Sequence, residues 1–594
     1  MRWCIFGTDF FVCDCEKLKM YWMYIEFFGK KQAGKDVSKM CRRINQWFPN
    51  ENLPHTKEMD GMSMNQKTPE PTMGAEPPVC GNVQVSLCDR VITTDLGGDF
   101  SLPDYQPEIR RLLRIGASAT PPARYAGGNG MDLAGTVDYF VLYMGNDDQV
   151  YCAPLSAEYR MQAPFDADAG ENVSEPFVCV CDVCAEGAAG RVTAPRRLNI
   201  RCRIRANVRV YGERSLSCPD ENGLAPGSVE RLESHAQVCR VFCGTSDPTA
   251  LQDDMILPQG ADVRVVCAEG QVMVTEAVAD RDAVTCRGEV TLKLLLAPLG
   301  TPTDGETVPP AAPTVALRRV PFTVTLDMPG VTPDCTACAH GACSELSVQG
   351  EEGHIHTDLG IVLEATAQRN ETVCYTGDLF STRAAGECRF ADCAAGRALQ
   401  TVQGNFTLSD SLPLSEAGID PAAQTVDILA SAQPETVSCS KGRAVLSGTC
   451  RFQLLLCKAG EWSTAEIVRP FRYECDLPVG ADTEQPTFDG TVTAVTCRAR
   501  MDGERVGLDA ELAVSLRLTA PLSLHLLAGV TFGADVPRRR GEYVICFPAP
   551  SDTLWSVAKR YHAPLTALAA ANDLPAAASP DDAGSLAGIG YLIV

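Results

Sequence analysis

The sequence predicts a mainly β protein with three repeated antiparallel β domains followed by a small βααβ domain. Three observations carry this prediction. Several long runs alternate apolar and polar residues, are rich in β-branched residues and are separated by Gly, Pro and Asp. A set of sequence landmarks recurs three times in the same order. Near the C-terminus, apolar residues recur instead with the period of a helix.

Length and charge limit the classes of function. At 594 residues the chain is too long for one hydrophobic core. Its formal charge of -23 opposes nucleic-acid binding, which depends on Lys and Arg that neutralise phosphates. The apolar runs are shorter than the ~20 residues of a membrane-spanning helix. Asp9, Asp14 and Glu16 interrupt the place where an export signal would need an uncharged segment. We therefore expect no nucleic-acid partner, no membrane span and no export.

The repeat consists of four landmarks. A Leu-Pro pair comes first, then a Gly that opens an apolar strand, then a Pro-Phe pair and finally a long alternating run. The Leu-Pro pairs begin at Leu102, Leu257 and Leu412. The strand-opening glycines are Gly135, Gly288 and Gly448. The Pro-Phe pairs begin at Pro164, Pro321 and Pro470. The long alternating runs are "NIRCRIRANVRV", "HIHTDLGIVLEA" and "RVGLDAELAVSLRL". Since the order is the same each time, we predict three copies of one β unit.

These landmarks set the predicted domain boundaries. The predicted domains are residues 76–215, 235–370 and 375–522, followed by a linker at 523–540 and the βααβ domain at 541–594. Residues 1–75 do not match the repeat and are basic and aromatic relative to the rest. This unassigned segment is either an aromatic docking arm or a disordered or wrongly assigned leader, and the second interpretation is favoured.

One short helix is expected within the β domains. In "PEIRRLLRI", Pro107 suits a first helical turn, and Ile109, Leu112 and Leu113 would share one face. Between the copies, "SCPDENGLAPGS" and "SEAGIDPAAQ" have the composition of loops.

The 28 cysteines are interpreted as reduced, half-buried strand residues, because disulfide scaffolds are usually short secreted chains. Three clusters have some of the residue types of a metal site, but neither cysteine cluster has a second knuckle to complete four zinc ligands. They are Cys179, Cys181 and Cys184; Cys335, Cys338, His340 and Cys343; and His354 with His356. The alternation in "FVCVC" and "HIHTDLGIVLEA" favours strands with one buried face. We expect no metal and no cofactor.

The C-terminal residues predict strand, helix, helix and strand. "EYVICF" is the first strand, and Asp552 is placed to cap a helix. The core face of that helix would carry Leu554, Val557, Ala558 and Tyr561. A second helix fits "PLTALAAAN", with Pro564 in its first turn and Asn572 in the left-handed closing position. The final "GYLIV" would pair with the first strand.

This segment resembles the LysM domain. The resemblance rests on Tyr543, Asp552-Thr553-Leu554-Trp555, Val557-Ala558, Tyr561, Asn572, Leu574 and a closing Gly588. Ser551 stands where the family has Gly, and "PAAASPDDAGS" lengthens the segment after Leu574. LysM domains bind N-acetylglucosamine polymers between the loop after the first strand and the loop after the second helix, so both departures lie at the expected groove.

The resemblance implies a ligand or partner groove of eight residues. They are Asp552, Thr553, Leu554, Trp555, Asn572, Leu574, Gly588 and Ile589. Core packing is the favoured role for Tyr561, whereas core packing and ligand contact are equally weighted for Trp555. Asp552 is interpreted as a helix cap, and Thr553 as the better candidate contact.

The repeated unit is similar to the SPOCS domain of spore-forming Firmicutes. The similarity rests on "DFSLPDYQPEIRRLLRI", "GTVDYFVLY" and "RRLNIRCRIRANVRV" in the first copy, whereas the other two copies have drifted. Three SPOCS domains followed by one LysM domain imply a spore-coat morphogenetic protein. Such a protein is a non-enzymatic adaptor in the mother-cell cytoplasm, at the forespore surface and spore coat. It joins the ATPase of the coat basement layer and other coat proteins and helps encase the forespore, with LysM as a protein-docking module.

Two other functions stay open. The first is a cell-wall protein in which LysM binds peptidoglycan and the β units act as spacers. The second is a hydrolase embedded in one repeat, for which the Cys and His residues from Cys335 to His356 are the candidates. The sequence contains no Gly-x-Ser-x-Gly, no His-Glu-x-x-His, no phosphate-binding loop and no dinucleotide fingerprint, so an enzyme is not expected.

Overall fold

A computed structural model describes the chain at residues 4–6, 9–11, 81–127, 129–166, 173–216, 228–258, 263–298, 313–351, 353–477, 486–536, 544–574, 580–582 and 586–594. Contacts within the chain divide it into two units, Met1–Ala75 and Glu76–Val594. In the first unit, the described residues form an antiparallel pair of β1 (Cys4–Phe6) and β2 (Asp9–Phe11). The rest of the predicted segment 1–75 lies outside the described residues.

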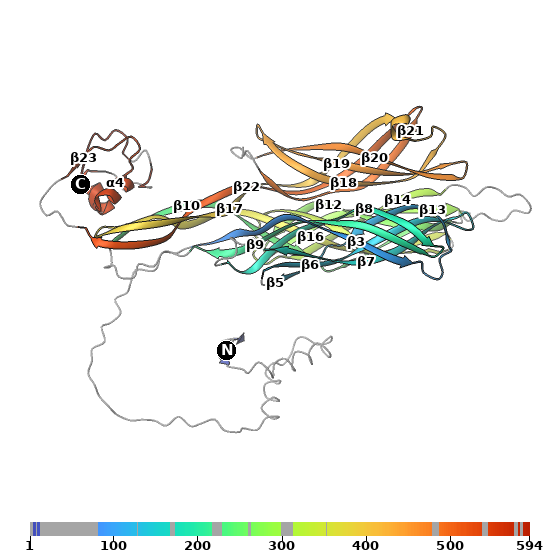
Figure 1. The fold of residues 1–594 in the computed structure, drawn as a ribbon, viewed down its shortest axis with the longest axis horizontal. Coiled ribbons are helices and arrows are strands. Elements are labelled where there is room, and N and C mark those ends of the chain that lie inside the picture. Colours follow the sequence, from blue (N-terminus) through green and yellow to red (C-terminus); the bar gives the residue numbers. More distant parts are fainter. Residues whose placement is uncertain are drawn as a thin grey trace, which may run out of the picture. The chain divides into compact units, whose positions relative to one another are not determined.

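The second unit is mainly antiparallel β (Figure 1). Its first two sheets are formed by residues between Asn82 and Ser215. One sheet has the order β3 (Asn82–Ser101), β9 (Arg197–Ser215), β8 (Val173–Ala194). In the other, β6 (Gly130–Gly145) pairs with β4 (Ile109–Ala119), β5 (Ala123–Gly127) and β7 (Val150–Pro164). The first strand of the segment thus pairs with the last.

In the next segment of the chain, the first strand again pairs with the last. Here β16 (His354–Ser381) pairs with β10 (Val229–Thr245), β11 (Thr249–Ile256) and β15 (Thr336–Glu351). The second sheet is β12 (Val263–Asp280), β13 (Ala283–Pro298), β14 (Thr314–Asp327).

A third pair of sheets follows. One sheet is β17 (Ala384–Pro413), β22 (Arg505–Asp535), β21 (Thr487–Asp502), and the other is β18 (Gln424–Ser440), β19 (Arg443–Lys458), β20 (Glu461–Asp476). We call the sheets built on β9, β16 and β22 the terminal sheets, and those built on β6, β13 and β19 the central sheets. Each pair of sheets lines a hydrophobic core, and the first core also includes residues from terminal sheets of the other two pairs.

The recurring glycines lie where a central strand has no room for a side chain. Gly288 of β13 is paired with Phe322 of β14, and a Cβ on it would lie 2.1 Å from the Met273 carbonyl oxygen. Gly448 of β19 is paired with Phe471 in the same way, and a Cβ would lie 2.2 Å from a carbonyl oxygen. In these two cases the Gly landmark and the Pro-Phe landmark are therefore two sides of one cross-strand contact, in which the Gly packs against the Phe ring.

The first copy departs from this rule. Gly135 is paired with Tyr159 on β7, and a Cβ there would lie 2.6 Å from the Tyr159 hydroxyl oxygen. Phe165 follows the end of β7 and is not the partner of Gly135. The expected equivalence of the first Pro-Phe pair with the other two is therefore wrong, because Tyr159 occupies the position that Phe has in the later copies.

The expected helix in "PEIRRLLRI" is wrong. Residues Ile109–Ala119 form β4, which pairs with β6 and has register shifts after Ile109 and after Leu112. The two irregularities let Leu112 pack on the first core while Leu113 packs in a cluster shared by the three central sheets. Pairing and burial on both sides thus override a helical spacing of apolar residues.

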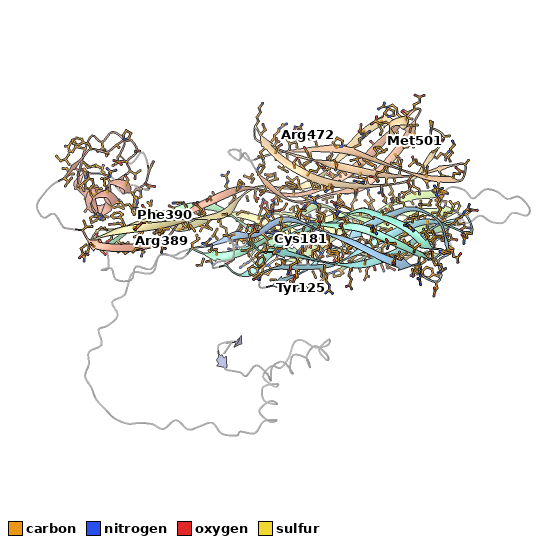
Figure 2. The ribbon with its side chains drawn as sticks, viewed as in Figure 1. Tyr125, Cys181, Arg389, Phe390, Arg472 and Met501 are labelled. Carbon is orange, nitrogen blue, oxygen red and sulfur yellow. The ribbon has the colours of Figure 1, made fainter. Side chains whose placement is uncertain are left out.

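The expected linker at 523–540 is also different in the structure. Strand β22 continues to Asp535, and its last part pairs with β17 from Ala384 onward. Figure 2 labels Phe390 on β17, whose ring stacks on His525 of β22 with a centroid distance of 4.8 Å. The predicted boundary at 370 falls inside β16, which runs to Ser381. The segment "SEAGIDPAAQ" begins within α3 (Leu414–Ala417), so it is not all loop.

Four buried charged residues join the three central sheets. They are Arg114 on β4, Glu269 on β12, Lys293 on β13 and Asp427 on β18. Arg114 pairs with Asp427, and the Lys293 Nζ lies 2.9 Å from Glu269 and 3.1 Å from Asp427. Burial alone would raise the pKa of Asp427, but Arg114 and Lys293 outweigh it and hold that pKa below its ordinary value.

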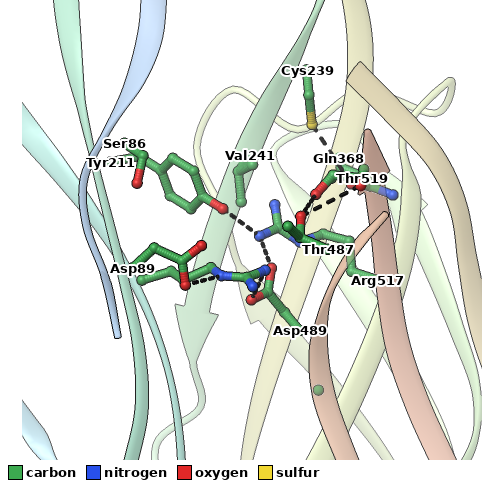
Figure 3. Close-up of polar contacts among 12 residues, drawn as sticks. Ser86, Asp89, Tyr211, Cys239, Val241, Gln368, Thr487, Asp489, Arg517 and Thr519 are labelled. Carbon is green, nitrogen blue, oxygen red and sulfur yellow. Dashed lines mark hydrogen bonds and ion pairs between the residues drawn. The ribbon is translucent and has the colours of Figure 1, made fainter. Parts of the chain in front are cut away.

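A second buried polar cluster joins the terminal sheets (Figure 3). The guanidinium of Arg517 on β22 donates 2.8 Å to the Tyr211 hydroxyl of β9 and pairs with Asp489 of β21. Arg209 of β9 also pairs with Asp489, and it donates 2.8 Å to Asp89 of β3. Arg517 is 1% exposed, so its charge depends on these partners alone.

We expect Asp427→Asn to lower the free energy of unfolding by about 3–5 kcal/mol, because it leaves Arg114 and Lys293 buried with too little negative charge. Urea denaturation followed by circular dichroism measures the change. The matched control is Asp476→Asn in the exposed pair with Arg443, which should cost about 0–1 kcal/mol. Equal effects of the two variants would show that the buried cluster does not hold the central sheets together.

Candidate functional site

The predicted groove belongs to the last part of the chain. Its elements are β23 (Ile545–Cys546), α4 (Leu554–Tyr561), α5 (Leu565–Ala571) and β24 (Leu592–Ile593), and the two strands pair antiparallel. We call this segment, Val544 to Val594, the C-terminal module. Leu554, Val557 and Ala558 of α4 are buried, as expected from their spacing. Tyr561, expected in the core, is 38% exposed.

The helix cap is one residue later than expected. Thr553 is the N-cap: its Oγ1 accepts 3.1 Å from the Ser556 amide, and its own amide donates 2.9 Å to the Ser556 hydroxyl. Asp552 accepts instead from the Ala549 amide, at 2.9 Å, and pairs with Arg560. The Arg560 guanidinium and this amide hold the pKa of Asp552 below its ordinary value. Thr553, expected as the free ligand contact, is thus part of the cap.

The Trp555 side chain packs against another part of the same unit. It is 3% exposed, and its ring meets Phe380 of β16 at a centroid distance of 5.0 Å. Its indole Nε1 donates 2.8 Å to Asp378, which also accepts from Lys559 at 2.6 Å. His562 Nδ1 lies 2.7 Å from the Ser381 carbonyl oxygen. These contacts fix α4 against the end of β16. Of the two roles considered for Trp555, core packing and ligand contact, they favour core packing.

The remaining predicted residues have structural roles. Asn572 bridges α5 and β24: its side-chain amide donates 2.8 Å to the Ile593 carbonyl oxygen and accepts 2.7 Å from the Ile593 amide. It is not in the left-handed conformation predicted for it, which Asp573 adopts with φ of 52°. The Leu574 amide donates 3.0 Å to Ala569, and Leu574 and Ile589 pack on the core of the module. Gly588 has φ of 84°, a conformation that favours glycine.

Two direct hydrogen bonds join the walls of the expected groove. The Trp555 amide donates 3.0 Å to the Pro580 carbonyl oxygen. The Thr553 hydroxyl donates 3.0 Å to the Asp581 carboxylate. Pro580 and Asp581 belong to the lengthened segment after Leu574, so this insertion contacts the residues that a sugar would contact in the resembled domain. Tyr543 lies outside the described residues.

An exposed apolar surface lies on the two strands of the module. In the observed register, Ile545 pairs with Ile593 and Cys546 with Leu592, so Phe547 follows opposite Tyr591. Cys546 and Leu592 are buried, whereas Ile545, Phe547 and Tyr591 are 58%, 75% and 57% exposed. We call Phe547 and Tyr591, together with the neighbouring apolar Ile545, the outer aromatic surface. Sequence reasoning assigned them to strands only; "YVICF" and "YLIV" are apolar throughout, so no alternation indicated which side chains point outward.

The cysteine and histidine clusters do not come together as metal sites in the described part of the chain. Cys179 and Cys181 are buried in the first core, but Val180 is buried too, so "FVCVC" has both faces covered. The alternation of "HIHTDLGIVLEA" holds at its start, where Ile355, Thr357 and Leu359 are buried. His356 pairs with Asp254 and Asp358 at the surface.

His340 has two carboxylates as neighbours. Its Nε2 lies 3.4 Å from Glu364 and 3.7 Å from Asp182, and Arg124 of β5 also pairs with Glu364. Asp182 accepts from the Gly490 amide at 2.9 Å. Burial alone would lower the pKa of His340, but the two carboxylates outweigh it and raise the pKa above its ordinary value. The group therefore joins strands of all three pairs of sheets.

A cavity of about 640 Å³ opens between the sheets and is lined by residues that include Glu186, Glu269 and Glu345. Glu269 belongs to the buried charge cluster, and Glu186 accepts 2.9 Å from Gln433. Glu186 and Glu269 thus hold strands together, and Asp138, Glu345 and Glu466 also line the cavity.

No protein-family model matches this sequence, and no curated protein or solved structure matches it either. Within the described ranges, the chain has no helix of the length and apolarity needed to cross a membrane.

Trp555→Phe should keep the ring packing but lose the bond to the Asp378 carboxylate, at a cost of about 1.5–3 kcal/mol. We therefore expect faster hydrogen exchange of the α4 amides in the variant. Tyr591→Phe, an exposed change in the same module, is the control and should leave exchange unchanged. Unchanged exchange in Trp555→Phe would show that the bond from the Trp555 indole to Asp378 does not hold α4 in place.

His340 should stabilise the fold most at acidic pH. Because its folded pKa is raised, its contribution is complete below the unfolded value of ~6.5 and is lost as pH rises through the folded pKa. The melting-temperature difference between the wild type and His340→Asn should therefore be largest near pH ~6 and shrink toward pH ~9. A difference that grows with pH would contradict this assignment.

Proposed function

We propose that this chain is a non-enzymatic protein adaptor of endospore coat assembly, resembling SipL-like spore-coat morphogenetic proteins. In this proposal, three SPOCS domains and a LysM domain act in the mother-cell cytoplasm, at the forespore surface and in the coat. The chain joins the ATPase of the coat basement layer and other coat proteins and helps encase the forespore. Support comes from the residues that resemble both families and from the pairing of the first strand with the last in each of the three pairs of sheets.

The observation that carries the adaptor function is the state of the groove. Thr553 and Trp555, the best candidates for a sugar contact, bond to Asp581, Pro580 and Asp378 of the same chain. A sugar that contacts Thr553 and Trp555 would have to replace their hydrogen bonds within the chain. The gain from the new bonds would then not offset the full cost of removing water from the sugar and the groove. The groove side therefore suits intramolecular packing better than glycan binding.

The outer aromatic surface supplies a contact surface of the kind that proteins use. Aromatic side chains dominate the binding energy of many protein interfaces, because each buries a large area with few rotatable bonds. Phe547 directly follows β23, Tyr591 directly precedes β24, and both are more than half exposed. In the proposal they bind the basement-layer ATPase. The alternative, a cell-wall protein that binds peptidoglycan through N-acetylglucosamine polymers, would use Thr553 and Trp555 instead.

The test measures binding of the full chain to two materials, a purified basement-layer ATPase from a spore-forming Firmicute and insoluble peptidoglycan. Phe547→Ala with Tyr591→Ala should weaken ATPase binding by roughly ten-fold or more, since truncated aromatic anchors commonly cost ~2 kcal/mol or more. Thr553→Ala is the control and should leave that affinity unchanged. Retention on peptidoglycan that depends on Thr553, without ATPase binding, would reject the adaptor and favour the wall protein.

A further inference from the structure

Two free cysteines from different pairs of sheets meet at the junction of the central sheets. Cys152 lies on β7 and Cys267 on β12, 115 residues apart in sequence, and their Sγ atoms are 3.1 Å apart. Cys267 is 9% exposed, whereas Cys152 is half-buried. Both belong to an apolar cluster to which all three central sheets contribute.

Polar interactions on both sides of the two thiols hold β12 against the first central sheet. Arg264, at the start of β12, donates 2.9 Å to the Val150 carbonyl oxygen and 3.3 Å to the Gln149 side chain. Its guanidinium also lies 4.4 Å from the centre of the Tyr151 ring. Beyond Cys267, the Glu269 carboxylate of β12 lies 3.7 Å from the Arg114 guanidinium of β4, a strand of the first central sheet. The two sulfurs are thus positioned by interactions that do not involve sulfur.

We propose that Cys152 and Cys267 form a reversible disulfide that links the first central sheet to the second when a small-molecule disulfide such as oxidised glutathione is present. The pair is a modification site that is separate from the C-terminal module and from the proposed coat partner. It covalently joins strands β7 and β12, which also meet through the bond from the Arg264 side chain to the Val150 carbonyl oxygen.

The chemistry balances with that oxidant. The Cys152 thiol is the more accessible and loses its proton to solvent; its thiolate attacks one sulfur of oxidised glutathione and releases one glutathione. Cys267 then loses its proton and attacks the Cys152 sulfur of the mixed disulfide, which releases the second glutathione. The two protein thiols lose two electrons and two protons, and oxidised glutathione gains them.

The neighbours of Cys267 fix this order of attack. The contact with Cys152 and burial raise the pKa of the Cys267 thiol well above its ordinary value, while Arg114 acts against this rise. Because the thiolate is the attacking form, Cys267 is slow toward an oxidant from solution and reacts once its partner sulfur is held beside it.

The sequence makes this pair easy to detect. Trypsin cleaves after Arg124 and Arg160 on one side and after Arg264 and Arg281 on the other, and each of the two peptides contains a single cysteine. A disulfide-linked pair of these peptides therefore identifies the bond without ambiguity.

The experiment treats the reduced full chain with oxidised glutathione, blocks the remaining thiols and identifies linked tryptic peptides by mass spectrometry. We expect the Cys152 and Cys267 peptides to be linked roughly ten-fold or more often in the folded chain than in urea, because the fold supplies a high effective concentration. Cys457→Ser, in the same apolar cluster, should leave the link intact. Cys152→Ser should abolish it and the thermal stabilisation that accompanies it, and dithiothreitol should reverse both in the wild type.

A short dithiol peptide in the same tube reports that the oxidant is active. If this peptide is oxidised while Cys152 and Cys267 stay reduced, or if they link no more often in the folded chain than in urea, the proposal is wrong. The wild-type measurement alone decides the question, so a variant that fails to fold does not prevent the test.

Discussion

The arrangement of the three pairs of sheets depends on four buried charges that must neutralise one another. Arg114, Glu269, Lys293 and Asp427 come from four strands and three pairs of sheets. Removing each charge from water costs several kcal/mol, by the general magnitude for buried ions, and only the complete set returns that energy. A misplaced strand would leave a buried charge without its partner, so the cluster favours one arrangement of the three central sheets over alternatives that bury the same apolar area.

The terminal sheets are joined by the same kind of constraint. Arg517 is buried among Tyr211 and Asp489, which lie on strands far apart in sequence. The two clusters and the shared apolar cluster give the junction both charge and shape complementarity. The C-terminal module follows the same rule on a smaller scale, since Asp378 of β16 accepts both the Trp555 indole and the Lys559 ammonium. Thr553 and Trp555 of the expected groove bond within the chain, whereas Phe547 and Tyr591, next to its two strands, are exposed to solvent.

The sequence predicted the class of fold well and the local exceptions poorly. Alternation identified strands, although "FVCVC" proved to be buried on both faces, and the glycine landmarks at Gly288 and Gly448 proved to be cross-strand contacts with Phe322 and Phe471. The helix expected at Ile109 failed because two register shifts give a strand the apolar spacing of a helix. The linker expected after residue 522 failed because the composition of β22 does not reveal that β17 extends beside it.

The sequence by itself determined the strand-rich character, the recurring landmarks, the buried face of α4 and the absence of a long apolar span, since each depends on residues close together in the chain. Only the tertiary structure decided which polar groups meet. Trp555 and Asp378 are 177 residues apart, and Arg114 and Asp427 are 313 apart. Such partners are favoured because a buried polar group without a partner would cost desolvation energy in the folded chain. A local sequence pattern does not show which distant groups become buried together. For this reason the sequence placed Thr553 and Trp555 in an open groove, and the folded chain uses both to hold itself together.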